Sequence, residues 1–185
     1  LKSEDIKKEK ILGIGIAVPG LINKKANILE FAPNLGWNNL DIIDYFSEFE
    51  VPVILENEAN AAVIGEREFV HSGENNMVFV SINEGIGCGL IFNGQLYPGN
   101  SGNAGEFGHI IIENKGRKCH CGNRGCWETL ASTSFIIEKY KKISGKQNID
   151  FTYIIKKIAE DNLNNTLINI FKETAYNIGL GLVNI

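Results

Sequence analysis

The feature that most constrains the fold of this 185-residue chain is a cluster of cysteines in the segment 108–128, "GHIIIENKGRKCHCGNRGCWE". Cys119, Cys121 and Cys126 lie close together there, and His109 precedes them. A Cys-x-Cys pair does not easily close a disulfide on itself, whereas two thiolates on a tight loop can face one ion. A third thiolate and an imidazole complete the tetrahedral Cys₃His set that is typical of structural zinc. The spacing therefore predicts a closed zinc loop.

The residues around the cysteines support this interpretation. Glycine allows the sharp turns that such a loop requires, and Gly116, Gly122 and Gly125 lie around the cysteines. His120 is an alternative ligand to His109, but it lies between two ligands and is expected to point away. The competing interpretation is a set of free thiols in a reducing cytosol with an incidental histidine. The fourth cysteine, Cys88, is interpreted as a small core residue.

Composition limits the class of protein. The formal charge of −4 and the absence of a basic block argue against a nucleic-acid surface on this stretch. No apolar run reaches the roughly 18 residues that a membrane span needs, and no signal peptide is visible. We therefore expect a cytoplasmic location and no membrane partner. The chain begins with Leu1 rather than Met, which suggests that the native N-terminus lies elsewhere.

The first third of the chain alternates apolar runs with turn residues. Continuous apolar runs closed by turn residues predict buried strands at residues 11–20 and 51–57. The segment between them begins with a hairpin return at 21–31, followed by helical spacing at 41–49. An Ala-rich helix is expected to begin near Glu58. This alternation is typical of an α/β fold.

The remainder changes from strands to helices. Consecutive antiparallel strands are expected at residues 77–82, 87–92 and 95–99, joined by Gly and Asn turns. From about Trp127 onward, apolar residues recur at three- and four-residue steps and predict helices at residues 135–144, 151–162 and 167–185. The final helix is still apolar at Ile185, so the chain looks cut rather than capped. The class is α/β or mixed α+β with a helical C-terminal part.

Several segments together resemble the ROK family of repressors, open reading frames and sugar kinases. The segment 108–128 is similar to the zinc signature of the family, and "SINEGIGCGLIFNGQLYPGNSGNAGEFGH" resembles its other signature. Further similar segments occur in the family's order, namely "GIGIAVPGLIN", "APNLGWNNL", "ENEANAAVIGE" and "AYNIGLGLVNI". The resemblance implies an actin-like (ribonuclease H-like) fold of two α/β domains, here truncated at both ends. Residues 1–57 would be the remainder of the small N-terminal domain, and residues 58–185 the larger domain with the zinc loop.

The same resemblance implies a sugar site. It assigns sugar contacts to Asn34, Asn57, Glu58, Glu106, His109 and Glu128. These residue types suit a sugar, because a carboxylate can accept from two neighbouring hydroxyls while an amide both donates and accepts. One ring nitrogen of His109 would bind zinc and the other would face a sugar hydroxyl. The alternatives are solvated surface carboxylates at Glu106 and Glu128, and a turn residue at Asn34.

Two departures from the family's kinases weaken a catalytic interpretation. Glu58 stands where the kinases carry their catalytic Asp, and its extra methylene moves the carboxylate by roughly 1 Å. Asn83-Glu84-Gly85 stands where they carry the Gly-Thr-Gly phosphate loop, so the Glu84 charge would repel a phosphate unless it turns outward. The other phosphate loop would precede residue 1, and the adenosine-binding segment would follow residue 185. We therefore expect no ATP binding and no catalysis.

The resemblance is strongest to transcriptional repressors of the NagC/XylR type, here without their helix-turn-helix. A monosaccharide or derivative would be the effector, and operator DNA would be bound through the missing N-terminal domain. A homodimer or higher homo-oligomer is expected, with "NIGLGLVN" (177–184) as a candidate contact by analogy. The alternative is an ATP-dependent sugar kinase of the glucokinase or fructokinase type. A purely structural zinc module is a third possibility, disfavoured by Glu106 and Glu128.

Overall fold

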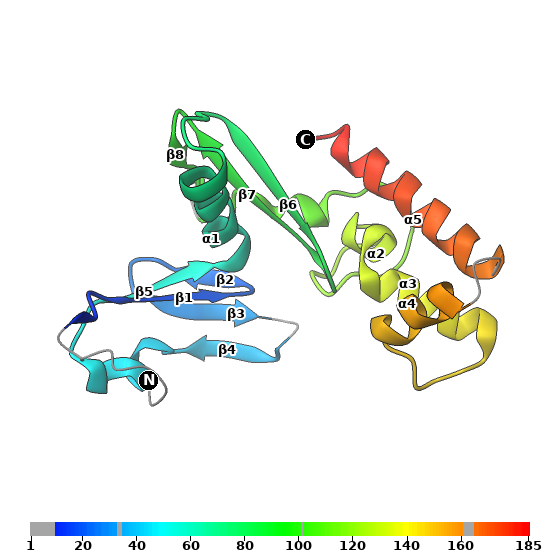
Figure 1. Cartoon of the computed structure of the whole chain (residues 1–185), viewed down its shortest axis with the longest axis horizontal. Helices are drawn as coiled ribbons and strands as arrows, with labels where there is room; N and C mark the ends of the chain where they lie inside the picture. Colours follow the sequence, from blue (N-terminus) through cyan, green and yellow to red (C-terminus); the bar gives the residue numbers. More distant parts are fainter. Residues whose placement is uncertain (1–9, 33–34, 101, 161–164) are drawn as a thin grey trace. The chain divides into compact units, whose positions relative to one another are not determined.

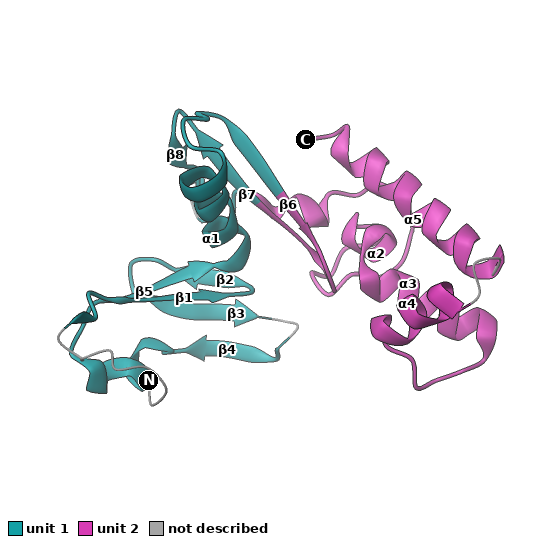
Figure 2. Cartoon of the chain, in the orientation of Figure 1, with its two compact units in different colours: residues 1–79, 89–104 teal, residues 80–88, 105–185 magenta. Residues whose placement is uncertain are grey.

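The computed structural model describes residues 10–32, 35–100, 102–160 and 165–185. These residues form two compact units, coloured separately in Figure 2. Unit 1 comprises residues 1–79 and 89–104, and unit 2 comprises residues 80–88 and 105–185. The division expected from the sequence, at residues 57 and 58, concerns the domains of the complete fold and stays a prediction.

Unit 1 begins with two small sheets (Figure 1). Strand β1 (Ile14–Val18) pairs in parallel with β5 (Val53–Asn57). Val18 and Leu55 are their buried residues, so the two strands are less buried than expected. Between them in the chain, β2 (Leu21–Asn23), β3 (Ile28–Ala32) and β4 (Trp37–Leu40) form an antiparallel sheet. The buried side chains that join these sheets are Val18, Leu29, Ala32, Ile42 and Leu55. The expected strands and hairpin return are confirmed, whereas β4 was not predicted.

The turn that starts the hairpin depends on Gly20. This residue has a φ of +106°, and a Cβ there would clash with the carbonyl oxygen of Phe31 on β3. An L-residue would therefore be strained in the backbone and crowded by the neighbouring strand. Gly20 thus lets the turn between β1 and β2 lie against the end of β3.

Unit 1 contains short helices as well as strands. Residues 41–49 were expected to be helical, and Ile43–Phe49 form a 3₁₀ helix (η2). The Ala-rich helix begins at Glu58 as expected: α1 (Glu58–Gly65) continues into a π-helical turn, η3 (Glu66–Val70). Gly89 allows a close approach between β7 and α1, since a Cβ there would clash with the carbonyl oxygen of Ala59.

A third sheet contributes residues to both units. It contains β6 (Met77–Ile82), β7 (Ile86–Phe92) and β8 (Gln95–Leu96) in that order. β7 and β8 are antiparallel, and the Asn93-Gly94 turn between them has positive φ at both residues. Asn-Gly is the preferred pair for such a two-residue hairpin. The strands expected in this region are therefore present, with β8 shorter than the predicted segment.

Unit 2 contains the helical C-terminal part of the chain. Its helices are α2 (Glu128–Ala131), α3 (Thr133–Ser144), α4 (Phe151–Glu160) and α5 (Asn165–Leu182). Helix α3 starts where the hydroxyl of Ser132 accepts a hydrogen bond from the backbone N–H of Phe135, at 3.3 Å, and ends at Gly145 in the left-handed region. Among the described residues, no helix is long and apolar enough to cross a membrane.

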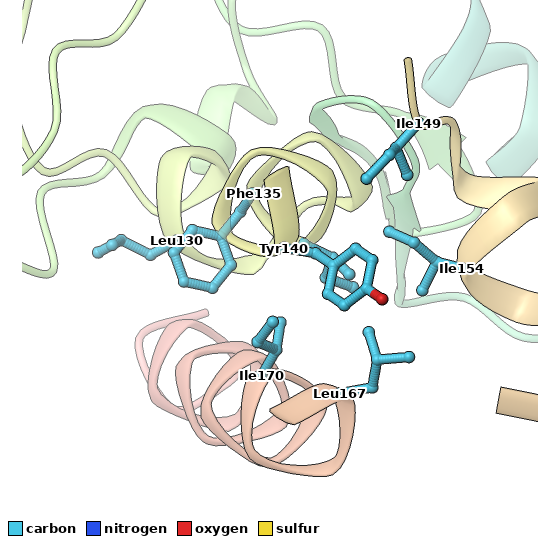
Figure 3. Packing of buried hydrophobic residues seen from close by; sticks show 8 residues of the cluster. Leu130, Phe135, Tyr140, Ile149, Ile154, Leu167 and Ile170 are labelled. Carbon is cyan, nitrogen blue, oxygen red and sulfur yellow. The ribbon is translucent and has the colours of Figure 1, made fainter. Parts of the chain in front are cut away.

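One hydrophobic core holds these helices together (Figure 3). Its apolar side chains come from α2, α3, α4 and α5 and from Ile149, which lies between α3 and α4. The buried members are Leu130, Phe135, Ile136, Tyr140, Ile149, Ile154, Leu167 and Ile170. In a second buried cluster, Trp127, which follows the cysteine loop, packs against residues of β6, β7 and α5.

Candidate metal centre and sugar site

The cysteine loop of unit 2 is folded by backbone hydrogen bonds. The N–H of Cys119 donates to the carbonyl oxygen of Asn123 at 2.8 Å, and the N–H of Gly125 donates to that of Arg117 at 2.8 Å. Isolated bridges pair Lys118 with Arg124 and Ile111 with Cys126. The loop is therefore a small, closed β-like turn rather than an open excursion.

The glycines expected to make sharp turns do so in two ways. Gly122 and Gly125 have φ angles of +96° and +76°. Gly116 does not, but a Cβ there would lie 2.8 Å from the Cα of Gly125. Positive φ and close backbone approach are the two situations that select glycine.

The structure brings the four expected ligands together. One ligand atom from each of His109, Cys119, Cys121 and Cys126 lies within 4.8 Å of all the others. The Sγ atoms of Cys121 and Cys126 are 3.6 Å apart, and Nδ1 of His109 is 3.5 Å from Sγ of Cys119. In a tetrahedral zinc site, ligand bond lengths imply about 3.8 Å between two sulfurs and about 3.6 Å between sulfur and nitrogen. The donor set and its spacing therefore fit zinc.

The three thiols differ in how far they are buried. Cys119 and Cys126 are buried, whereas Cys121 is exposed. Burial, together with a hydrogen bond to the Glu128 carboxylate, raises the pKa of the Cys119 thiol, and burial also raises the pKa of Cys126. Burial acts in the same direction on Cys121, but hydrogen bonds with the Asn123 backbone and with the other two thiols outweigh it and lower its pKa. Because a metal takes thiolates, binding here would release protons.

The two ring nitrogens of His109 face different groups. Nδ1 faces the thiols, while Nε2 lies 3.6 Å from Oε2 of Glu106. Oε1 of Glu128 lies 3.5 Å from Nδ1 and accepts a hydrogen bond from the Cys119 thiol at 3.0 Å. His120 is exposed and lies outside the group of metal-ligating atoms. The ring of His109 is thus placed between the thiols and Glu106, as the expected double role requires.

Two of the expected sugar residues therefore lie beside the candidate metal ligands. Glu106 comes from the short 3₁₀ helix η4 (Glu106–His109), and Glu128 begins α2. Burial raises the pKa of the Glu106 carboxyl; the His109 ring opposes this rise and the charge of Glu128 adds to it. Two carboxylates and a ring nitrogen at one place form a set of hydrogen-bonding groups suited to neighbouring hydroxyls.

The remaining expected sugar residues belong to unit 1. Asn34 lies outside the described residues. The Asn57 side chain caps α1, accepting from the N–H groups of Ala59 and Asn60, and its amide donates to the Gly20 carbonyl at 3.0 Å. Helix capping was not anticipated for Asn57, although Asn immediately before a helix is a common capping signal.

Glu58 occupies the first turn of α1, where its carboxylate is exposed. A negative charge in the first turn of a helix is favourable, because it interacts with the positive end of the helix dipole. This local stabilisation is independent of any ligand. The role of Glu58 as a sugar contact stays a prediction.

The Asn83-Glu84-Gly85 turn is fixed by the start of α3. The carbonyl oxygen of Asn83 accepts from the N–H of Thr133 at 2.8 Å, and that of Glu84 accepts from the Ser134 hydroxyl at 2.8 Å. The Asn83 amide donates to the Ser81 hydroxyl. The Glu84 residue is exposed, so its carboxylate is solvated at the tip of this turn.

Residues of α5 support the cysteine loop through Trp127. Local sequence patterns did not indicate which residues these are. The Nε1–H of Trp127 donates to the backbone oxygen of Asn177 at 2.8 Å, and Gly181 packs against the same indole. Trp127 is fully buried. The residues in these contacts lie about fifty positions apart in the sequence. The small residues of "NIGLGLVN" were therefore the one local signal that α5 packs closely against another segment.

Cys88 provides a prediction for alkaline pH. Burial and the charge of Glu106 raise the pKa of this thiol from 9.0 to about 11. A raised pKa stabilises the fold below the unfolded value, and that contribution is lost as the pH rises from 9 towards 11. Between pH 8 and 10.5 we expect wild-type protein to lose about 2 kcal/mol more unfolding free energy than Cys88→Ala. Urea unfolding at both pH values measures this difference; equal losses would contradict it.

Comparison with known proteins agrees with the motifs. The ROK family model matches residues 1–185. A xylose repressor of Bacillus spizizenii is 43% identical over 181 residues, which are 95% of this chain and 45% of the repressor. The chain therefore spans about half the length of the curated relatives it matches.

Two solved structures share the fold. A ROK family glucokinase from Streptomyces griseus, in complex with glucose and AMPPNP, superposes with a TM-score of 0.82 at 28% identity, covering 95% of this chain and 61% of the kinase. A ROK family transcriptional regulator, a homologue of the E. coli MLC protein, gives a TM-score of 0.76 at 29% identity, covering 92% and 45%. The fold is thus the actin-like α/β fold that these kinases and regulators share, and the chain belongs to the ROK family.

Proposed function

We propose that this chain is the sugar-binding, zinc-containing part of a ROK transcriptional repressor. The observation that carries the proposal is the 43% identity to a xylose repressor across 95% of the chain. An alignment that covers 95% of the chain spans the central segment 106–128, which holds the group of possible metal ligands and the two carboxylates beside it. DNA would be bound by a helix-turn-helix outside this chain, in a homodimer or higher homo-oligomer, and the cytoplasmic location stays a prediction.

The proposed metal role is structural. His109 and the three cysteines would occupy all four positions of a tetrahedral ion, which leaves no position for a reacting group. When bound, zinc would fix the loop that presents Glu106, His109 and Glu128. In this proposal His109 and the three cysteines hold the loop, and Glu106, His109 and Glu128 bind the sugar. None of these residues transfers a proton.

Sugar recognition is proposed to depend on the polar groups beside the ligands. Nε2 of His109 and the carboxylates of Glu106 and Glu128 would pair with sugar hydroxyls. A site built from such groups would reject a sugar that lacks the matching hydroxyl, because the polar atoms that the sugar covers are then left unpaired. Asn34, Asn57 and Glu58 are proposed as further contacts, on the family resemblance.

Regulation would follow from a difference in affinity between two states of the full protein. A sugar that binds one domain arrangement more tightly shifts the population towards it, and its effect on DNA binding is no larger than that difference. Two features argue for regulation without phosphoryl transfer, namely Glu58 at the catalytic position and Asn83-Glu84-Gly85 at the phosphate loop.

A sugar kinase is the second candidate. It is favoured by the likeness to the glucokinase that was solved with glucose and AMPPNP. Glu58 also keeps a carboxylate, exposed at the start of α1, where a general base would be required. The two candidates share the sugar site and differ in nucleotide chemistry.

The test is a measurement of binding and turnover on the full-length protein. A panel of aldoses and N-acetylhexosamines is titrated by calorimetry, and each sugar is then supplied with ATP and magnesium. Binding that shifts operator affinity without formation of sugar phosphate supports the repressor. Phosphate transfer at enzyme-like rates supports the kinase and overturns the proposal. No binding by any sugar, with metal still bound, would leave a structural zinc module.

A further inference from the structure

Trp127 lies between two residues of the proposed site. Its neighbours in sequence are Cys126, a proposed metal ligand, and Glu128, a proposed sugar contact. Its side chain is fully buried, in a cluster that includes Ile86, Cys88 and Ala131. Because one peptide bond separates Trp127 from each neighbour, the position of its ring constrains both of them.

Two hydrogen bonds at Asn177 join helix α5 to the Trp127 ring and to α2. The backbone oxygen of Asn177 accepts from Nε1 of Trp127 at 2.8 Å. Its side-chain amide donates to the carbonyl oxygen of Leu130 at 3.1 Å, within α2. Asn177 thus binds both the indole and the short helix that begins with Glu128.

Gly181, one turn further along α5, fixes how closely the helix approaches. A Cβ on Gly181 would overlap the indole at its ring-fusion edge, near Cε2, Nε1 and Cδ2. Gly181 is buried and inside a helix, where alanine has the higher propensity. Its selection is therefore explained by the contact with Trp127 and not by the helix backbone.

We propose that Asn177 and Gly181 are positioning residues that set the place of Cys126 and Glu128 through Trp127. The inference rests on the proposed metal and sugar site and assigns its control to the C-terminal helix. A shift of α5 would move the indole and thereby change both metal and sugar affinity. Residues that orient ligands without touching the ion typically change metal affinity by about 10- to 100-fold when replaced.

The test compares two glycines of the same helix in the full-length protein. Gly181→Ala adds a methyl group against the indole, whereas Gly179→Ala adds one where nothing lies within 4 Å. Both gain the same helix propensity. Cobalt(II), which absorbs visible light in tetrahedral thiolate sites, is titrated as the metal probe. We expect about a tenfold weaker cobalt affinity for Gly181→Ala and an unchanged affinity for Gly179→Ala.

A double variant that combines Gly181→Ala with a smaller residue at position 127 separates positioning from a general loss of stability. Trp127→Leu removes the ring that the new methyl group would meet. If Gly181→Ala acts through Trp127, the double variant binds cobalt as Trp127→Leu alone does. Additive losses in the double variant would overturn the proposal, because they would show that Gly181→Ala disturbs α5 independently.

Fluorescence supplies a readout that does not depend on metal. In a Trp37→Phe background Trp127 is the remaining tryptophan of this chain. Once any tryptophan elsewhere in the full-length protein is also replaced by phenylalanine, Gly181→Ala is expected to shift the Trp127 emission towards that of an exposed indole. Wild-type protein without cobalt binding would reject the metal site itself. Wild-type binding with equal affinity in Gly181→Ala and Gly179→Ala would reject only the positioning role.

Discussion

Replacing Cys126 by serine is expected to weaken zinc binding at least about 100-fold, which corresponds to about 2.8 kcal/mol. Cys126 is fully buried, and its sulfur lies 3.6 Å from that of Cys121. Serine retains neither the thiolate nor its affinity for zinc. Because an ion held by four side chains would stabilise the folded loop, the variant is also expected to unfold at a lower temperature than wild-type protein when zinc is present. Competition with a chromophoric chelator and thermal unfolding with and without zinc measure the two effects.

The matched control is Cys88→Ala. Cys88 is the one cysteine outside the metal-ligating group, and it is also buried. Its replacement removes a buried thiol without removing a ligand, so zinc affinity is expected to be unchanged. Equal zinc affinity in Cys126→Ser and wild-type protein would show that Cys126 is not a ligand.

Replacing Glu128 by glutamine is expected to weaken sugar binding about 100-fold, or about 2.8 kcal/mol, with the fold retained. The carboxylate accepts from neighbouring hydroxyls, whereas the amide presents a donor at one of the two positions. A hydrogen bond that involves a charge contributes more than a neutral one, and an unmatched group at a buried site adds its own desolvation cost. Calorimetry with whichever sugar binds the wild-type protein measures the loss.

Glu160→Gln removes the same charge from an exposed position near the end of α4. Sugar affinity is expected to be unchanged in this control. Glu128→Gln should still bind zinc, because the carboxylate is not one of the four metal-ligating groups, and sugar binding is compared in the zinc-loaded proteins because Glu128 contacts two of those groups. Wild-type sugar affinity in Glu128→Gln would remove Glu128 from the proposed site.

Local patterns were sufficient where local chemistry decides the structure. The apolar run that became β1, the start of α1 at Glu58 and the glycine turns of the cysteine loop follow from propensity and steric freedom. The metal-ligating group was predictable because three cysteines and a histidine at this spacing leave few other uses. The four predicted ligands are the four that the structure groups.

Other features depend on contacts that a single segment does not encode. Strand β4, "WNNL", is short and half polar, and it becomes a strand because β3 supplies the pairing edge. Helix α5 begins at Asn165 and ends at Leu182, short of the predicted end at Ile185. The support of Trp127 by Asn177 joins residues 50 positions apart, and no periodicity within either segment indicates it.

The attachment of the Asn83-Glu84-Gly85 turn to α3 bears on how such a chain diverges. The turn is held by its own carbonyl oxygens, which bind Thr133 and Ser134 whatever side chains residues 83 and 84 carry. Substitutions at its tip therefore meet little resistance from folding, and mutations can accumulate there by drift once selection for a phosphate site is relaxed. Under the proposed repressor function, the residues that argue against phosphoryl transfer therefore lie on a turn whose attachment to α3 uses main-chain oxygens only.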